Sequence, residues 1–253
     1  MKILSIGNSF SQDAHKWLHD IAAAQGLDIY TANLYIGGCS LETHYNNIKG
    51  NKADYEYEIN GGECSRMISI NEALTLDDWD IVTLQQASHF SGRPQTYFPY
   101  LESVCNYVKG VLPDARIYIH ETWSYEIDSW HEAFADYNKD QGEMYRRLHD
   151  CYIMAGKVIG APVIPVGTVI ESIRHEIPEF DFAGGKRSIH RDGFHLSLNY
   201  GRYAAAATWI SFITGADLRG NSFVPQVEGL ETDPALIKKI QDKVYEKINM
   251  QKN

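Results

Sequence analysis

A serine near the start of the chain and a histidine–aspartate pair near its end are the residues best suited to chemistry. Ser9 ends the stretch Gly7-Asn8-Ser9, which follows an apolar run and precedes a helical pattern. A strand, a tight turn and a helix lift one side chain above the carboxyl edge of a parallel sheet. The Ser9 hydroxyl is therefore a candidate nucleophile, although serine after glycine is also a common turn residue.

The histidine–aspartate pair lies in His190-Arg-Asp192-Gly-Phe-His195, an irregular segment just before a helix. At this spacing Asp192 can accept the Nδ1–H of His195 and leave Nε2 free as a base. A serine hydroxyl needs such a base before it becomes a good nucleophile. The structural alternative is that Asp192 forms a turn or caps a helix, with His195 packed nearby.

Two further features could stabilise the negative oxygen of an acyl-transfer intermediate. The turn Gly37-Gly38 follows the second strand pattern, where glycine allows a backbone N–H to approach a substrate closely. Gln85-Gln86 ends the third strand pattern, and a side-chain amide can donate to the same oxygen. Only one of the two glutamines should face Ser9, because successive strand residues point to opposite faces.

The elements that must position these residues alternate between strand and helix. Strand patterns cover residues 3–6, 27–36, 79–86, 115–120 and 161–166, and helical patterns cover 13–25, 41–52, 96–111, 130–159, 168–175 and 198–213. This alternation predicts an α/β fold with a mainly parallel sheet and helices on both faces. Ligands bind at the carboxyl edge of such sheets, where all four candidate features fall.

We expect a single domain over residues 1–253, because no linker-like stretch divides the chain. Two alternating runs across Gly61-Gly62 predict a β-hairpin at about 54–70, inserted near the carboxyl edge of the sheet. Residues of about 233–249 form an amphipathic pattern with Leu236, Ile237, Ile240, Val244 and Ile248 facing inward. This pattern is typical of a surface helix.

The composition limits the classes of partner. A net charge of −10 and the absence of a basic run argue against nucleic acid and anionic membranes. The chain shows no signal peptide and no apolar stretch of the ~18 residues that span a bilayer, so we expect a cytoplasmic protein. The 4 cysteines are scattered without a C-x-x-C motif, which predicts reduced, structural thiols.

Taken together, these motifs resemble the SGNH (GDSL-like) hydrolase superfamily. Gly7-Asn8-Ser9-Phe10-Ser11 is similar to its first block, Gly38 to the glycine of its second block, and Asp192-Gly-Phe-His195 to the D-x-x-H of its fifth. The resemblance implies a flavodoxin-like three-layer sandwich with a five-stranded sheet of order 2-1-3-4-5. It also implies acyl hydrolysis without a metal or other cofactor, with Ser9 as nucleophile, His195 as base and Asp192 orienting it.

The third block departs from the superfamily pattern. The resemblance places the N–H groups of Ser9 and Gly38 in the oxyanion hole, and an asparagine from a G-x-N-D block usually completes it. Here the corresponding segment reads Gln85-Gln86-Ala-Ser-His89, and a direct alignment puts His89 at the asparagine position. Carbohydrate acetylesterases carry a Q-G-E turn that is similar to Gln86-Ala87-Ser88. We therefore prefer Gln86 as the third donor, with His89 as the second choice.

These features predict a serine esterase that removes a small acyl group, with acetyl preferred, from a carbohydrate or another small molecule. His89, His120 and Trp123 are expected to line the substrate pocket. A thioesterase or lysophospholipase acting on a longer chain is the alternative enzyme, and a non-catalytic carbohydrate-binding domain is the alternative outside enzymes. A phosphate-binding module is disfavoured, because the chain lacks G-x-G-x-x-G and a P-loop. The oligomeric state does not follow from the sequence.

His15 and His19 are spaced i, i+4 on a predicted helix, as in some zinc sites. No glutamate stands beside His15, and Lys16 would repel a cation. We therefore expect these histidines to lie on a solvated helix face rather than to bind metal.

Overall fold

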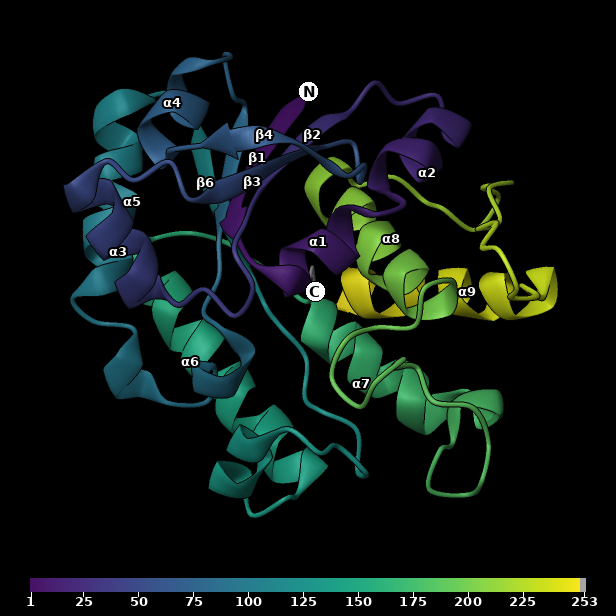
Figure 1. The fold of residues 1–253 in the computed structure, drawn as a ribbon. Helices are drawn as coiled ribbons and strands as arrows, with labels where there is room; N and C mark the ends of the chain where they lie inside the picture. Colours follow the sequence, from purple (N-terminus) through teal and green to yellow (C-terminus); the bar gives the residue numbers. More distant parts are fainter. Residues whose placement is uncertain (251–253) are drawn as a thin grey trace.

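The framework of the molecule is a β-sheet, seen in a computed structural model that describes residues 1–250, the side chains of Cys64 and Ser65 excepted. Its strands are β1 (Lys2–Gly7), β2 (Tyr30–Tyr35), β3 (Tyr55–Ile59), β4 (Cys64–Ile68), β5 (Ile81–Leu84), β6 (Arg116–His120) and β7 (Val163–Ile164). They form a 7-stranded sheet of order β4-β3-β2-β1-β5-β6-β7 (Figure 1).

The strands β2-β1-β5-β6-β7 run parallel, which confirms the predicted order 2-1-3-4-5. The sheet nevertheless has 7 strands rather than five, because the predicted hairpin joins it. β3 pairs antiparallel with β2, and β4 pairs antiparallel with β3. The hairpin therefore lies at a side edge of the sheet, not at its carboxyl edge, and satisfies the outer backbone groups of β2.

Helices cover both faces of the sheet and complete the predicted three layers (Figure 1). One layer contains α3 (Leu41–Gly50), α4 (Ile70–Thr75), α5 (Tyr100–Val111) and α6 (Gln141–Ile159). The other contains α1 (Ser9–His15), α2 (Leu18–Ala24), α7 (Val166–Glu176), α8 (Tyr200–Thr214) and α9 (Pro234–Met250). The core lies between these layers and the sheet.

The burial of the elements follows their sequences. All four residues of β5 are buried, as expected for a parallel strand covered on both faces. In α8 the small residues Ala204, Ala205, Ala206 and Ala207 are fully buried, because this helix is apolar around its circumference. The predicted helix 198–213 is thus a core helix that supports the sheet from one side.

Two predicted helices are each broken into two segments. The pattern at 13–25 becomes α1 and α2, because Trp17 leaves the helical conformation (φ −112°, ψ 6°) and its indole N–H donates to the Leu198 carbonyl at 2.8 Å. The pattern at 130–159 becomes a 3₁₀ segment, Glu132–Tyr137, and then α6. Asn138 and Lys139 lie between the two segments, and both have positive φ. This conformation ends the 3₁₀ segment before Asp140 caps α6.

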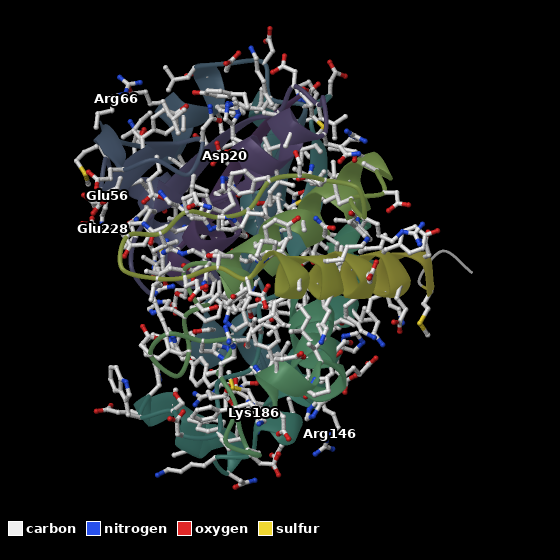
Figure 2. The ribbon with its side chains drawn as sticks, turned by 90° about the vertical axis from the view of Figure 1, so that its right-hand side faces the viewer. Asp20, Glu56, Arg66, Arg146, Lys186 and Glu228 are labelled. Carbon is white, nitrogen blue, oxygen red and sulfur yellow. The ribbon has the colours of Figure 1, made fainter. Side chains whose placement is uncertain are left out.

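The predicted surface helix at the carboxyl end is confirmed as α9. Its predicted inward residues are buried, namely Leu236, Ile237, Ile240, Val244 and Ile248. α9 lies across one side of the molecule with its outer face exposed, and on that side Arg66 lies far from Arg146 and Lys186 (Figure 2). These three basic groups therefore do not form one patch.

The cysteines and the helices bear on two other predictions. Cys39, Cys105 and Cys151 are buried free thiols, as predicted, whereas the side chain of Cys64 lies outside the described residues. Between residues 1 and 250, no helix has both the length and the apolar character needed to cross a bilayer.

Candidate active site

The turn from β1 into α1 presents Ser9 at the carboxyl edge of the sheet. Asn8 caps α1 by accepting the Phe10 N–H at 3.0 Å, and its amide donates to the Cys39 carbonyl at 3.0 Å. Ser9 is the first residue of α1. Because the first N–H groups of a helix have no acceptor within the helix, the Ser9 N–H can donate to a ligand.

Asp192 and His195 form the predicted pair. One oxygen of Asp192 accepts the backbone N–H groups of Phe194 and His195 at 3.2 and 2.8 Å, and the other lies 2.7 Å from His195 Nδ1. Gly193 has φ +88° in this tight turn, where a Cβ would lie 3.0 Å from the Ser129 Cα. Asp192 therefore forms the turn, as in the structural alternative, and also holds the imidazole.

Ser9 and His195 meet although they are 186 residues apart, with 2.8 Å between Ser9 Oγ and His195 Nε2. The result is a continuous chain of hydroxyl, imidazole and carboxylate. Burial tends to raise the pKa of Asp192, but hydrogen bonds from the backbone and ring of His195 outweigh it and lower that pKa. The carboxylate therefore stays charged and can stabilise a positive imidazole. His195 is 19% exposed, so solvent or a ligand can reach it.

Gly38 lies in the turn that follows β2, and this turn is fastened to Asn8. Gly38 has φ +63°, a conformation that glycine adopts without strain. The Cys39 N–H donates to the Ile36 carbonyl at 3.1 Å, and the Cys39 carbonyl accepts the Asn8 amide. The turn that carries Gly38 is thus held beside the turn that carries Ser9. Both backbone N–H groups predicted for an oxyanion hole belong to this connected pair.

The structure does not support Gln86 as the third donor of the oxyanion hole, because its side-chain amide is already fully hydrogen-bonded. Gln86 is 1% exposed, and its amide N–H groups donate to the backbone and hydroxyl oxygens of Thr96 at 2.9 and 3.1 Å. Its carbonyl accepts the backbone N–H groups of Leu41 and Ala87 at 3.0 and 2.8 Å. All of its hydrogen-bonding capacity is used to join loops, so no N–H is left for an oxyanion.

His89, the second choice, lies beside the Gly38 turn. A Cβ built on Gly38 would lie 4.0 Å from His89 Cε1. Among the described residues, the His89 ring makes no hydrogen bond, so its ring N–H can donate to a ligand. Burial lowers the pKa of His89, and the neighbouring His131 and Arg93 lower it further. A neutral imidazole at this position can act as a hydrogen-bond donor, as an asparagine amide would.

His120 and Trp123 do not line an open pocket, contrary to the prediction. Both side chains are fully buried and pack beneath the residues of the site. Trp123 stacks on Phe10 at 4.3 Å between ring centroids, and its indole N–H donates to the Phe194 carbonyl at 2.8 Å. His120 Nδ1 lies 2.9 Å from Oε1 of the Gln85 side chain.

Gln85 is the glutamine that reaches the nucleophile turn, since its amide donates to Asn8 Oδ1 at 2.7 Å.

Asp13 is a residue of the site that sequence reasoning missed. It is 0% exposed and accepts hydrogen bonds from Arg191 at 2.9 Å, Arg202 at 2.7 Å and the Leu196 N–H at 2.9 Å. α1 is thereby fastened to the segment that carries His195. The available signal was an acidic residue four positions after Ser9, one helical turn along α1.

An aromatic wall beside the triad was also missed. Trp130 is 72% exposed, and its ring lies edge-on to Phe194 with 5.4 Å between centroids. His131 lies 5.1 Å from the same ring. A cavity of about 300 Å³ adjoins this wall and is lined in part by Trp130, Arg191 and Asp192. Phe194 stands inside the D-x-x-H motif, but nothing in the local sequence pairs it with Trp130.

The two histidines considered for zinc are not on a solvated face. His15 is 1% exposed and lies 2.7 Å from the Ser5 hydroxyl, while His19 Nδ1 lies 2.9 Å from the Ile29 carbonyl. The helix breaks after His15, so the i, i+4 geometry is lost. In the part of the chain that the structure describes, no three metal-ligating side chains are grouped as a metal site.

Comparisons with known proteins give a sequence family and several similar folds. A family model described as Domain of unknown function (DUF4886) matches residues 2–239. A DUF4886 family protein from Bacteroides uniformis is 35% identical with a TM-score of 0.89, covering 100% of this chain and 96% of that one.

Two solved structures are more distant. A protein from Slackia heliotrinireducens, proposed to be an SGNH hydrolase, is 22% identical with a TM-score of 0.57, over 84% of this chain and 98% of that one. The acetyl xylan esterase AlAXEase is 12% identical with a TM-score of 0.53, over 83% and 98%. No curated protein matches the sequence.

Proposed function

The chain belongs to the DUF4886 family and has the fold of the SGNH hydrolases, and from the geometry of its site we propose that it is a serine esterase. The observation that carries the proposal is the contact between Ser9 Oγ and His195 Nε2 at 2.8 Å, continued to Asp192 at 2.7 Å. A hydroxyl, an imidazole and a carboxylate in this order form a nucleophile, a general base and its orienting group.

In the first half of the reaction, Ser9 Oγ attacks the ester carbonyl as His195 Nε2 takes the hydroxyl proton. The carbonyl oxygen becomes negative and accepts hydrogen bonds from the N–H groups of Ser9 and Gly38, with the ring of His89 as the third donor. His195 then gives its proton to the leaving alcohol, and the acyl group remains on Ser9. Asp192 stabilises the positive imidazole throughout this half.

In the second half, His195 takes a proton from water, whose oxygen attacks the acyl carbon. The bond to Ser9 Oγ breaks, His195 returns the proton to that oxygen, and the carboxylic acid leaves.

The surroundings of the triad support a small acyl group and a bulkier alcohol. The buried stack of Phe10 and Trp123 fills the space beneath the site. The exposed Trp130 and the cavity next to Asp192 offer a flat aromatic surface with polar groups around it, which suits a sugar ring. We therefore propose an acetyl ester of a carbohydrate as the substrate.

The test is hydrolysis of p-nitrophenyl acetate, butyrate and octanoate by the purified protein. We expect acetate to be the best substrate, and Ser9→Ala to lower kcat by roughly 10⁴–10⁶-fold without loss of folding. Ser103→Ala is the matched control, because the one hydrogen bond that this α5 hydroxyl makes within the described residues is to the Pro99 carbonyl. A Ser9→Ala variant as active as the parent would refute the triad, and preference for octanoate would favour the lysophospholipase alternative.

The exposed Trp130 also supports a second candidate, a carbohydrate-binding domain without catalysis. It predicts that no ester is hydrolysed and that Ser9→Ala leaves sugar binding unchanged. Measuring oligosaccharide binding by tryptophan fluorescence beside the hydrolysis assay separates the two functions.

A further inference from the structure

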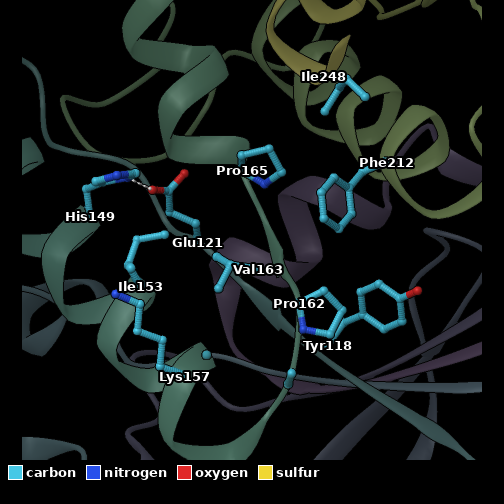
Figure 3. A pocket seen from close by; sticks show the side chains of 12 residues that line it. Tyr118, Glu121, His149, Ile153, Lys157, Pro162, Val163, Pro165, Phe212 and Ile248 are labelled. Carbon is cyan, nitrogen blue, oxygen red and sulfur yellow. Dashed lines mark hydrogen bonds and ion pairs between the residues drawn. The ribbon is translucent and has the colours of Figure 1, made fainter. Parts of the chain in front are cut away.

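A second cavity lies away from the triad, along the outer edge of β7. Its volume is about 820 Å³, within the size range of small-molecule sites. Val163 forms the floor, α6 contributes Ile153 on one side, and Phe212 of α8 and Ile248 of α9 stand on the other (Figure 3). We call this cavity the β7 groove. Most of its surface is apolar and open to solvent.

The β7 groove is poorly suited to binding another strand. β7 has only 2 residues, Val163 and Ile164, and is flanked by Pro162 and Pro165. The carbonyls of Pro162 and Ile164 already accept N–H groups of Ile119 and Glu121. Because proline has no N–H, the outer edge offers too few donors for strand addition. A small molecule is therefore a better occupant than an extended peptide or the edge of a second copy.

The α6 side of the groove carries nitrogen donors. His149 Nδ1 lies 2.7 Å from Glu121, a side chain only 1% exposed. Glu121 also accepts the N–H of Thr168 at 2.8 Å and its hydroxyl at 3.0 Å, so its oxygens are occupied within the protein. The hydrogen bond to Glu121 raises the pKa of His149, which favours the positive ring. The other ring nitrogen of His149 makes no hydrogen bond to any described residue.

Lys157 adds a second positive group on the same side of α6. It lies eight residues after His149, and its side chain runs back along the helix toward Ile153 (Figure 3). Among the described residues, Lys157 forms no hydrogen bond or ion pair. The groove thus combines an apolar floor and far wall with a near wall that carries two nitrogen donors, His149 and Lys157. Each has at least one donor group without a hydrogen-bond partner among the described residues.

We propose that the β7 groove binds an aliphatic carboxylate. Its hydrocarbon chain would lie over Val163 and against Phe212 and Ile248, and its carboxylate would accept hydrogen bonds from His149 and Lys157. Charge-assisted hydrogen bonds of this kind are stronger than neutral ones, and the chain leaves water on binding. This site is separate from Ser9 and does not depend on the proposed esterase activity.

Calorimetric titration with sodium octanoate, sodium butyrate and 1-octanol tests the proposal on the full chain. We expect octanoate to bind, butyrate to bind about 10²-fold more weakly because it has four fewer methylenes, and 1-octanol at least about tenfold more weakly. The double variant His149→Gln/Lys157→Gln should lose at least about tenfold in octanoate affinity. Glutamine at 149 can still donate to Glu121, which protects the fold. Ser9→Ala should bind octanoate as the parent does.

The matched control is His175→Gln, because His175 is an exposed histidine paired with Glu171 on α7, outside the groove. Amide shifts in a ¹⁵N NMR titration of the parent locate the site even if the double variant folds poorly. Shifts in α6, β7 and α8 would support the proposal. It is overturned if octanoate does not saturate, if its shifts cluster around Ser9, or if a folded double variant binds octanoate like the parent.

Discussion

At the scale of single residues, the site separates groups that face a ligand from groups that hold the scaffold. Ser9, Gly38, His89 and His195 have atoms free to act on a bound molecule. Gln86 has the right chemistry for an oxyanion donor, but its bonds to Thr96 and two backbone N–H groups commit it to structure. An amide that satisfies buried backbone groups cannot also be released to a substrate without leaving them unpaired.

Substitutions at His89 and Gln86 should therefore affect different quantities, namely turnover at His89 and stability at Gln86. His89→Ala should remain folded and lower kcat for p-nitrophenyl acetate by about 10²–10³-fold, and His89→Asn should recover part of this loss because an amide can donate in its place. Gln86→Ala should mainly lower the free energy of unfolding, by about 1–3 kcal/mol for each buried N–H left unpaired. Urea unfolding beside steady-state kinetics measures both effects. A stable but slow Gln86→Ala variant would restore Gln86 to the oxyanion hole.

At the scale of elements, the site depends on a junction between α1 and the segment after α7. Both carry triad residues. Asp13 of α1 accepts hydrogen bonds from Arg191 and the Leu196 N–H of that segment and from Arg202 of α8. Removing one partner of a buried ion pair leaves an uncompensated charge, which is strongly destabilising. The same change would loosen the alignment of His195 with Ser9. Asp13 is thus a positioning residue rather than one that touches substrate.

Asp13→Asn should therefore lower both stability and turnover. We expect a loss of about 3 kcal/mol in the free energy of unfolding, and a fall in kcat of up to about 10²-fold with KM nearly unchanged. Asp20→Asn on α2, where the side chain is exposed, is the matched control and should change neither quantity. A variant with reduced stability but full kcat below its unfolding temperature would show that Asp13 has no positioning role.

The sequence carried the alternation of strands and helices and the turns of Ser9 and Asp192, since these depend on local patterns. The strand order 2-1-3-4-5 was implied by the resemblance to the SGNH superfamily and not by any local pattern. It did not reveal that the hairpin extends the sheet, because strand pairing between β2 and β3 is a tertiary contact. At the break, Trp17 donates a hydrogen bond to Leu198, 181 residues away, and helical periodicity cannot report such a contact. For the same reason, the residues around Gln86 indicated that an amide donor was present but not that Thr96 and Leu41 would bind it. Long-range packing decided each of these outcomes.

At the scale of the whole molecule, several histidines are built into the core as neutral rings. His15, His44 and His120 are at most 1% exposed, and each has one buried ring nitrogen without a partner among the described residues. Burial lowers the pKa of all three from 6.5 to about 3. His15 of α1 lies against Ser5 of β1, His44 of α3 stacks on Tyr55 of β3, and His120 is the last residue of β6. Protonation of these rings is therefore coupled to the integrity of the sheet.

Mild acid should therefore destabilise the protein before its carboxylates titrate. Between pH 6.5 and about 3 the unfolded chain binds protons at His15, His44 and His120 that the folded protein does not, so the free energy of unfolding falls as the pH falls. Each ring contributes at most about 1.4 kcal/mol per pH unit. His149, whose pKa is raised, acts in the opposite sense around and above pH 6.5, and it adds no slope well below pH 6.5 because it is then protonated in both states.

Urea unfolding at pH 7.0, 6.0 and 5.0 measures this slope, and NMR titration of the imidazole C–H resonances identifies its source. We expect at least three of the 10 histidine signals to show no titration above about pH 4 in the folded protein. Full titration of every histidine near pH 6.5 with the fold intact would contradict the prediction, because it would mean that the core accepts the positive rings. A flat stability profile between pH 7.0 and 5.0 would contradict it independently, since buried neutral rings require a loss of stability over that interval.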